Sequence, residues 1–299
     1  MSSRTFGKKQ WDRKECLTAF LFLFPAFAVF TVFKYYPLLD NFRISLTNWN
    51  LFSEKMKFVG FENYARIFAS SDFWKILWNT VFYTVASTMI SIVLGFFAAK
   101  CLFGQKGKWP KVFSTLFFIP NITTASAVAI LWIWLFDPDF GLSGQLFNLF
   151  GMASPRWLLT PEYSMWVVIS LSVWRSIGYV MLIYTSGMTA ISNDVYEAAS
   201  IDGASKFQQT MKITVPLLKP TTYFLMLTMM IQAMQVFDIV SVMTGGGPYN
   251  STNVMNLYIY QQAFQRNRAG YASALSVVLF LILLSLTVVK QAASKNKED

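Results

Sequence analysis

Long stretches without a charged side chain decide what this chain can fold into. They cover residues 16–33, 76–99, 112–136, 220–237 and 269–289. Each is about as long as the ~20 residues that a helix needs to cross the hydrocarbon of a bilayer. A sixth segment, 163–193, is apolar except for Arg175. Because backbone groups in hydrocarbon must bond within the chain, such stretches form helices. The sequence therefore predicts an all-α membrane protein with six transmembrane helices.

The first apolar stretch has two possible interpretations. A basic N-terminal segment followed by an apolar stretch is typical of a signal peptide, but no small-residue cleavage site follows in the sequence FKYYPLLDNF. We therefore expect an uncleaved first helix, in which Pro25 is a tolerated kink.

Basic residues set the expected orientation, because Lys and Arg close to helix ends are retained in the cytoplasm. The short loop after the second helix carries Lys100, Lys106, Lys108 and Lys111, whereas the loop 137–162 has only Arg156. The loop 34–78 is also basic, but its acidic residues nearly balance it. We expect a multi-pass protein with two cytoplasmic tails, 1–15 and 291–299, around a transmembrane domain at 16–290. The loop 194–219 would then also be cytoplasmic.

Composition removes several classes of function. The sequence contains no histidine, which excludes imidazole ligands, His-containing triads and histidine proton relays. No GxxxxGK[ST] pattern for binding nucleotide phosphates occurs. The net charge of +10 belongs to a chain with 55% hydrophobic and only 13% charged residues. Its distribution fits membrane orientation and does not suggest nucleic acid.

A charged segment, EAASIDGASKFQQTMKITVPLLKP at 197–220, separates the fourth and fifth apolar stretches. Its beginning favours a short helix, which Gly203 ends because glycine accepts the left-handed conformation. A second short helix should follow, with Asp202 as its cap. Pro216 and Pro220 then interrupt the chain. Small residues at the bend would let it enter a groove on another protein; these are Ala198, Ala199 and Ala204.

The spacing of this segment resembles the EAA loop of permease subunits in ABC importers. That pattern is EAA, three residues, Gly, nine residues, Ile, one residue and Leu-Pro. The matching positions here are Glu197, Ala198, Ala199, Gly203, Ile213 and Pro216. Val215 stands where the pattern prefers Leu. In that family the loop docks on the ATPase, which implies a coupling role for Glu197, Ala198, Ala199, Asp202, Gly203, Ala204 and Pro216.

Two outer loops are similar to the sugar-importer branch that includes MalF-like permeases. They read VGFENYARIF at 59–68 and MTGGGPYNST at 243–252. The resemblance spans nearly the whole chain, with a core permease at about 75–290, and implies the type I ABC importer architecture. MalF itself has additional N-terminal helices and a large external domain, which leaves open which sugar is carried.

The resemblance also implies a location and a set of partners. The location is the inner (plasma) membrane of a prokaryote, within the lipid bilayer. The partners are a second homologous permease, two ATP-binding subunits, an external solute-binding protein and a saccharide substrate. ATP with Mg²⁺ would be held by the ATP-binding subunits, and this chain would bind no cofactor and catalyse no reaction.

Arg175 marks the expected substrate path. If its helix starts near Ser164 on the outer side, Arg175 lies about 16 Å deep, close to the bilayer midplane. A charge there costs about 2.5 to 3.5 kcal/mol on insertion scales, so it should face the bundle interior. The expected polar partners at a similar level are Gln232, Gln235 and Asp238.

Two roles remain open for this group. Arg175 and Asp238 can form an ion pair that only joins two helices. Alternatively, Arg175, Gln232 and Gln235 donate hydrogen bonds to sugar hydroxyls, and Trp174 or Tyr179 offers a ring face. Counting back from the EAA loop, Tyr179 matches a sugar-contacting tyrosine of the MalF-like permeases.

Three alternative functions fit the sequence less well or differ only in substrate. A permease of the same class for a phosphorylated solute, such as glycerol phosphate, differs only in its substrate. An autonomous secondary transporter would carry carboxylates inside the membrane and often an internal repeat, but the chain offers only Asp238 and no clear repeat. A membrane-embedded hydrolase lacks a nucleophile with a histidine base.

Overall fold

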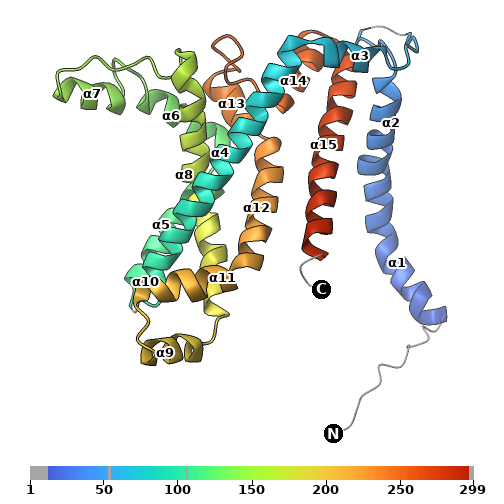
Figure 1. Ribbon diagram of the computed structural model, residues 1–299. Coiled ribbons are helices and arrows are strands. Elements are labelled where there is room, and N and C mark those ends of the chain that lie inside the picture. The colour runs from blue at the N-terminus through green and yellow to red at the C-terminus, as the bar shows by residue number, and fades with distance from the viewer. Residues whose placement is uncertain (1–12, 53–54, 106, 296–299) are drawn as a thin grey trace.

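The computed structural model describes residues 13–52, 55–105 and 107–295 (Figure 1). Within these ranges the regular structure is helical, apart from an isolated antiparallel bridge between Thr47 and Phe58. This confirms the all-α prediction. The first eight helices are α1 (Arg13–Phe30), α2 (Tyr36–Ser45), α3 (Glu62–Ala69), α4 (Ser71–Leu102), α5 (Trp109–Ile122), α6 (Ala125–Leu135), α7 (Leu142–Leu149) and α8 (Pro161–Thr189).

The second half of the chain continues with shorter helices up to the last one. They are α9 (Asn193–Ile201), α10 (Lys206–Gln209), α11 (Val215–Leu217), α12 (Lys219–Met234), α13 (Asp238–Met243), α14 (Met255–Tyr260) and α15 (Ala269–Lys295). Three π-helical stretches are Thr31–Tyr35, Thr210–Thr214 and Gln261–Gln265.

The two longest central helices have termini that suit the helix dipole. In α4, Asp72 lies in the first turn and Lys100 in the last turn. In α8, Pro161 begins the helix and Glu162 follows in the first turn. Proline without an N–H fits a first turn, acidic residues favour helix starts, and basic residues favour helix ends. These signals explain why α4 extends beyond its uncharged stretch at both ends, and why α8 begins two residues before its apolar segment.

Four helical segments in the described chain are long and apolar enough to cross a membrane. They are Leu17–Ser45, Ser71–Leu102, Pro161–Thr189 and Ala269–Val288. The pair α5 and α6 is a fifth candidate, although the two helices meet at 99°. The predicted fifth crossing at 220–237 corresponds to α12, which has only 16 residues. The described residues thus contain four or five candidate crossings, and the six predicted from the sequence are not confirmed.

The first helix is longer than expected. It does not end at residue 33 but continues through the π-helical stretch and α2 to Ser45. Arg43 donates to Asp40 at 2.7 Å one turn away, so its polar end is stabilised within the helix. Helical structure thus extends beyond the length that hydrocarbon requires. In the 18-residue stretch of this segment that best fits a membrane span, no residue is buried within the chain.

The third and fifth of the predicted transmembrane helices, at 112–136 and 220–237, are both broken. α5 carries Pro120 within it and ends at Ile122, and the backbone is extended at Thr123 and Thr124 before α6 begins. A proline and two β-branched threonines disfavour continuation of a helix. Likewise α12 ends at Met234, and Phe237 has non-helical angles of φ −140° and ψ −59°. The absence of charged residues therefore predicted how long each apolar segment is, but not that the helix within it would be interrupted.

The predicted tails fall mostly outside the described residues. Residues 1–12 and 296–299 are not described, whereas 13–15 belong to α1 and 291–295 belong to α15. The beginning of α1 and the end of α15 lie on the same side of the bundle as α9 (Figure 1).

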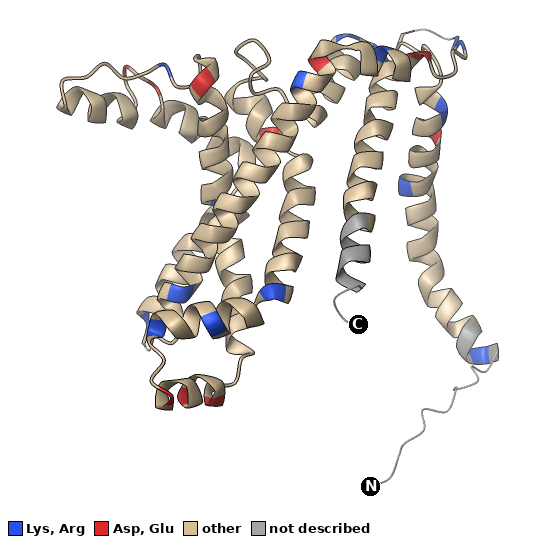
Figure 2. Cartoon of the chain, viewed as in Figure 1, with Lys and Arg blue, Asp and Glu red and all other residues tan. Residues whose placement is uncertain are grey.

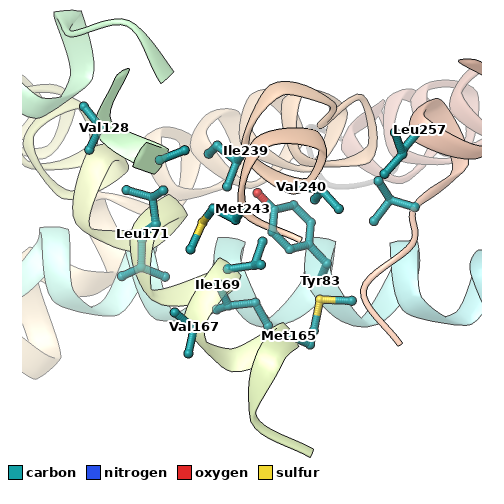
Figure 3. Packing of buried hydrophobic residues seen from close by; sticks show 14 residues of the cluster. Tyr83, Val128, Met165, Val167, Ile169, Leu171, Ile239, Val240, Met243 and Leu257 are labelled. Carbon is teal, nitrogen blue, oxygen red and sulfur yellow. The ribbon is translucent and has the colours of Figure 1, made fainter. Parts of the chain in front are cut away.

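The core is divided among three clusters of buried apolar side chains. One joins α4, α6, α8, α13 and α14 and contains Tyr83, Val168, Leu171 and Val240 (Figure 3). A second joins α3 and α14 to α4 and α15. The third joins α8 to α4 and α12 at the end nearest α9. Because α4 contributes to all three, it is the axis on which the other helices are placed.

Helices α5 and α8 lie in backbone contact. A Cβ added to Gly178 on α8 would collide with the carbonyl group of Phe117 on α5. Small residues allow membrane helices to approach this closely. The contact holds the end of α5, and hence the α5–α6 break, against the middle of α8.

Candidate functional site

A cavity of about 240 Å³ lies where α4 and α8 meet the two broken helices. α4 contributes Tyr83, Ser87, Thr88 and Ser91 to its wall, and α8 contributes Ser172, Arg175 and Ser176. The remaining wall comes from α6, from the end of α12 and from the start of α13. Irregular backbone at membrane depth is tolerated where it lines a cavity, and transporters commonly place their binding sites at such breaks.

The wall from α4 offers hydroxyl groups without partners. Thr88 and Ser91 are each 1% exposed, and within the described part of the chain neither Thr88 Oγ1 nor Ser91 Oγ has a hydrogen-bond partner. A buried polar group left unpaired costs about 1–3 kcal/mol. Both residues line the cavity, so a hydroxyl-bearing guest or water inside it would satisfy them.

Sequence reasoning missed this wall. Hydroxyl side chains recur along one face of α4 at Thr80, Thr84, Ser87, Thr88 and Ser91. The spacing of three and four residues places them on one side of a helix. Ser and Thr residues that recur on one face of an otherwise apolar stretch are the sequence signal that could have predicted this wall.

A matching polar face runs along α8. Ser172, Arg175 and Ser176 line the cavity, and Tyr179 follows one turn after Arg175. The hydroxyl groups of Ser172 and Tyr83 lie 2.6 Å apart, which links α8 to α4 within the cavity wall. This hydrogen bond fixes the distance between the two polar faces.

Arg175 donates hydrogen bonds to the end of the neighbouring helix α5, next to the α5–α6 break. Its guanidinium donates to the carbonyls of Pro120 at 3.3 Å, Asn121 at 3.4 Å and Thr123 at 3.1 Å. These carbonyls lie at the end of α5, where the break removes their intrahelical partners. A cation is also favourable at a helix C-terminus. The Arg175–Asp238 ion pair considered from the sequence is not formed; Arg175 instead caps α5.

The other predicted path residues are only partly brought together. Gln232, Gln235 and Asp238 line the same cavity as Arg175, at the α12–α13 break. Trp174 and Tyr179 do not line it. The Trp174 ring lies 4.9 Å from that of Trp132, between centroids, and Tyr179 packs against the cluster near α9.

The segment 197–220 forms a bend that is closely specified. Gly203 follows α9 with φ +78°, as predicted, and its N–H donates to Ser200 O at 3.1 Å. Ala204 N–H donates to Ala199 O at 2.9 Å. This pair of bonds is the Schellman motif, which satisfies the last carbonyls of a helix.

The expected cap of the second helix is wrong. Asp202 is the C-cap of α9, and Ser205 caps α10 instead. Ser205 Oγ accepts from Gln208 N–H at 3.3 Å, while Gln208 Oε1 accepts from Ser205 N–H at 2.8 Å. This reciprocal capping box satisfies two otherwise free donors. Ser205 caps α10 because it directly precedes that helix, whereas Asp202 is already the C-cap of α9.

Side chains brace the two short helices against each other. Gln209 Nε2 donates to Ser200 Oγ at 2.9 Å and to Ala204 O at 3.2 Å. The hydroxyls of Tyr196 and Thr214 lie 3.0 Å apart. The bend is therefore held by hydrogen bonds on both sides.

The outer surface of this bend is unusually apolar for a solvated loop. Ile201 is 86% exposed and Phe207 is 72% exposed, and Glu197 and Ala198 are also exposed. Figure 2 shows acidic residues along α9 and basic residues in the segment above it. Exposed large apolar groups beside charge are typical of an interaction site. Pro216 lies in α11, away from this surface, at the return to α12.

Within the described residues, no group of three or more Asp, Glu or Cys side chains is placed to hold a metal ion.

Comparison with known proteins assigns the chain to a family. The model of the family described as "Binding-protein-dependent transport system inner membrane component" matches residues 91–295. This chain belongs to that family. It is a permease subunit of an ABC transporter, a multi-pass membrane protein and not an enzyme. As the family description states, transport by its members depends on a binding protein.

Several relatives are similar over nearly their whole length. The probable ABC transporter permease protein YurN of Bacillus subtilis is 34% identical over 94% of this chain and 97% of its own. The trehalose/maltose transport system permease protein MalF of Thermococcus litoralis is 31% identical over 96% of each. The lactose transport system permease protein LacF of Rhizobium radiobacter is 31% identical over 99% of each.

The fold is also found in a solved structure. A chain from the crystal structure of a bacterial alginate ABC transporter, in complex with alginate pentasaccharide-bound periplasmic protein, superposes with a TM-score of 0.85. The match covers 95% of this chain and 96% of the other at 21% identity. The all-helical permease fold is thereby established.

Removing the Arg175 guanidinium should destabilise the fold and not only the cavity. In Arg175→Met the carbonyls at the end of α5 lose their donor, which should cost about 1.5–3 kcal/mol for a charged hydrogen-bonding group. We expect the thermal denaturation midpoint of the purified protein to fall by at least about 3 °C. Gln232→Ala, in the same cavity, is the control and should change it little. Equal shifts in both variants would contradict the capping role.

Proposed function

We propose that this chain is one permease subunit of an ATP-driven carbohydrate importer and forms half of the translocation path. The observation that carries the proposal is the polar cavity between α4 and α8, with unpartnered hydroxyls at Thr88 and Ser91. Hydroxyl groups that lack partners suit a ligand rich in hydroxyl groups. The names of the relatives point the same way, since two of those above are a trehalose/maltose and a lactose permease.

In this proposal the sugar passes along the facing polar sides of α4 and α8. Gln232 and Gln235 donate to its hydroxyls from the α12–α13 break, and Asp238 accepts from them. Arg175 holds the α5 end while it borders the same space. Tyr179, one turn further along α8, offers its ring on the way toward α9. Trp174 is engaged with Trp132 and takes no part.

The charge of the cavity favours a neutral sugar over a phosphorylated solute. Arg175 brings one positive charge and Asp238 one negative charge to its lining. The guanidinium of Arg175 is also already bonded to three carbonyls. A phosphate would therefore meet a cavity with no net positive charge, so we retain the phosphorylated solute only as the second candidate.

The membrane arrangement is part of the proposal. We infer six crossings, with α12 and α13 together as the crossing that no single helix provides, within a core permease of about 75–290. Both termini and α9 then lie in the cytoplasm. A second homologous permease completes the path, and two ATP-binding subunits hold ATP with Mg²⁺.

Coupling in this proposal depends on the bend between α9 and α10. Ile201, Glu197 and Phe207 dock on the ATP-binding subunit, and the braced bend transmits its displacement to α12 through Pro216. Closure of the ATP-binding pair would bring the two permeases from an inward-open to an outward-open state, a two-state change biased by nucleotide. A binding protein then delivers the sugar from outside.

The cavity can be tested with two neighbouring threonines. Thr84 and Thr88 both have a buried hydroxyl without a partner, but only Thr88 lines the cavity. Valine preserves the shape of threonine and removes the hydroxyl. In the reconstituted transporter with its binding protein, Thr88→Val should reduce sugar uptake about fivefold, the value of one hydrogen bond of about 1 kcal/mol. Thr84→Val should leave uptake near normal; equal effects would place the path elsewhere.

Coupling can be tested with two matched glycines. Gly203 has φ +78° and Gly104 has φ +77°, and an added Cβ meets nothing within 4 Å at either position. Alanine should impose a similar backbone strain of about 1 kcal/mol at both. We expect Gly203→Ala to reduce sugar-stimulated ATP hydrolysis and binding of the ATP-binding subunits, and Gly104→Ala to preserve both. A normal hydrolysis rate in Gly203→Ala would count against coupling through this bend.

The orientation can be tested by cysteine labelling in a variant that lacks Cys16 and Cys101. Asn148 on α7 and Ser205 before α10 are both exposed and lie at opposite ends of the bundle (Figure 1). In intact cells a membrane-impermeant maleimide should label Asn148→Cys and should label Ser205→Cys only after permeabilisation. The reverse pattern would invert the topology.

A further inference from the structure

A second hollow, of about 560 Å³, lies at the end of the bundle opposite α9. It is bordered by the loop 48–50, the end of α3 and the turn 266–268 that precedes α15. None of its lining residues also lines the path cavity. Its volume falls within the range of about 300–1,000 Å³ that is usual for small-molecule sites. We therefore asked what chemistry it can bind.

The lining of this outer pocket is positively charged. Arg66, Arg266 and Arg268 border it, against the single carboxylate of Asp72. Arg66 is paired with Glu62, whereas Arg266 and Arg268 form no ion pair within the described part of the chain. The long helix α15 begins directly after Arg268, so the positive end of its dipole adds to the two free guanidinium groups.

The two free arginines are placed by a tight turn. Arg266 N–H donates to Gln261 O at 2.9 Å, and Arg268 N–H donates to Gln262 O at 2.8 Å. Between them Asn267 has φ +55°, a left-handed conformation that is uncommon for a residue other than glycine. The turn thus holds both charges at the pocket instead of leaving them on a free loop.

A buried acceptor adds a second requirement. Gln262 lines the pocket and is 1% exposed, and no donor among the described residues reaches its Oε1. A simple anion cannot satisfy it, because Oε1 needs a donor. A ligand that carries a hydroxyl beside its negative charge satisfies both the arginines and Gln262. The side chains of Trp49 and Tyr258 supply further ring surface.

We propose that this outer pocket binds a hydroxyl-bearing anion of the glycerol phosphate type. The phosphate would bond to Arg266 and Arg268 in charge-assisted fashion, and a glycerol hydroxyl would donate to Gln262 Oε1. The same chemistry has two sources, a free polyol phosphate or the headgroup of phosphatidylglycerol in the outer leaflet. The inference takes the outer side from the orientation proposed above, but it does not depend on which sugar is carried.

The test uses the purified full chain with its co-purifying subunits in phosphatidylcholine nanodiscs. One arm titrates glycerol 3-phosphate calorimetrically. The other adds phosphatidylglycerol to the nanodiscs and counts retained lipid by native mass spectrometry. The double variant Arg266→Gln/Arg268→Gln should weaken binding about tenfold or more, because it removes two charged donors. The isosteric Gln262→Glu should do the same by repelling the anion.

Arg156→Gln, on the exposed outer loop away from the pocket, is the matched control and should bind normally. Thermal denaturation and sugar uptake of each variant confirm that it is folded. Binding in the first arm identifies a free solute, retention in the second arm alone identifies the lipid, and either supports the proposal. The proposal is overturned if wild type binds neither probe, or if the pocket variants bind as well as the control. Loss of binding-protein docking with unchanged anion binding would also overturn it and make this face a protein contact.

Discussion

Water is absent from the hydrocarbon of a bilayer, so every backbone group that a broken helix frees there needs a partner from the protein. Arg175 meets that requirement for the α5–α6 break by donating to three carbonyls at the end of α5. The 99° change of direction between α5 and α6 depends on it. The α6 side chains that complete the buried cluster around Tyr83 are placed by that turn. One guanidinium thereby joins the lining of the cavity between α4 and α8 to the course of the chain at the α5–α6 break.

Polar groups inside this bundle divide into two kinds. The hydroxyls of Tyr83 and Ser172 bond to each other at 2.6 Å and connect α4 with α8. Those of Thr88 and Ser91 lie a turn or two further along α4 and have no partner among the residues that the structure describes. The first pair stabilises the wall, and the second leaves the wall ready for a ligand. In the proposed path, the depth at which a sugar binds would therefore be set by where hydrogen bonding between protein groups stops.

Much of this arrangement can be predicted from the sequence. The physical basis of each prediction also explains which features the sequence does not reveal. Uncharged stretches locate apolar helices, and a Gly at the end of α9 predicts the bend because only glycine readily takes φ near +78°. Charge does not reveal where an apolar helix breaks, so the ends at Ile122 and Met234 were missed. The partner of Arg175 was also missed, because backbone carbonyls freed by tertiary bending carry no sequence signal. The hydroxyl face of α4 could have been predicted from the spacing of its Ser and Thr residues, whereas the predicted path was located from Arg175 and the residues near its depth.

The hydrogen-bonded bend between α9 and α10 has a further consequence, for the thermodynamics of assembly. A segment that folds only on docking loses conformational entropy at that moment, and part of the contact energy is spent on ordering it. Here the Schellman motif, the capping box and the Gln209 brace order the segment before any contact forms. If this surface docks on an ATP-binding subunit, as proposed above, the apolar area of Ile201 and Phe207 can act almost wholly as affinity. Association should resemble rigid-body docking, with a rate set by encounter and orientation and not by a folding step.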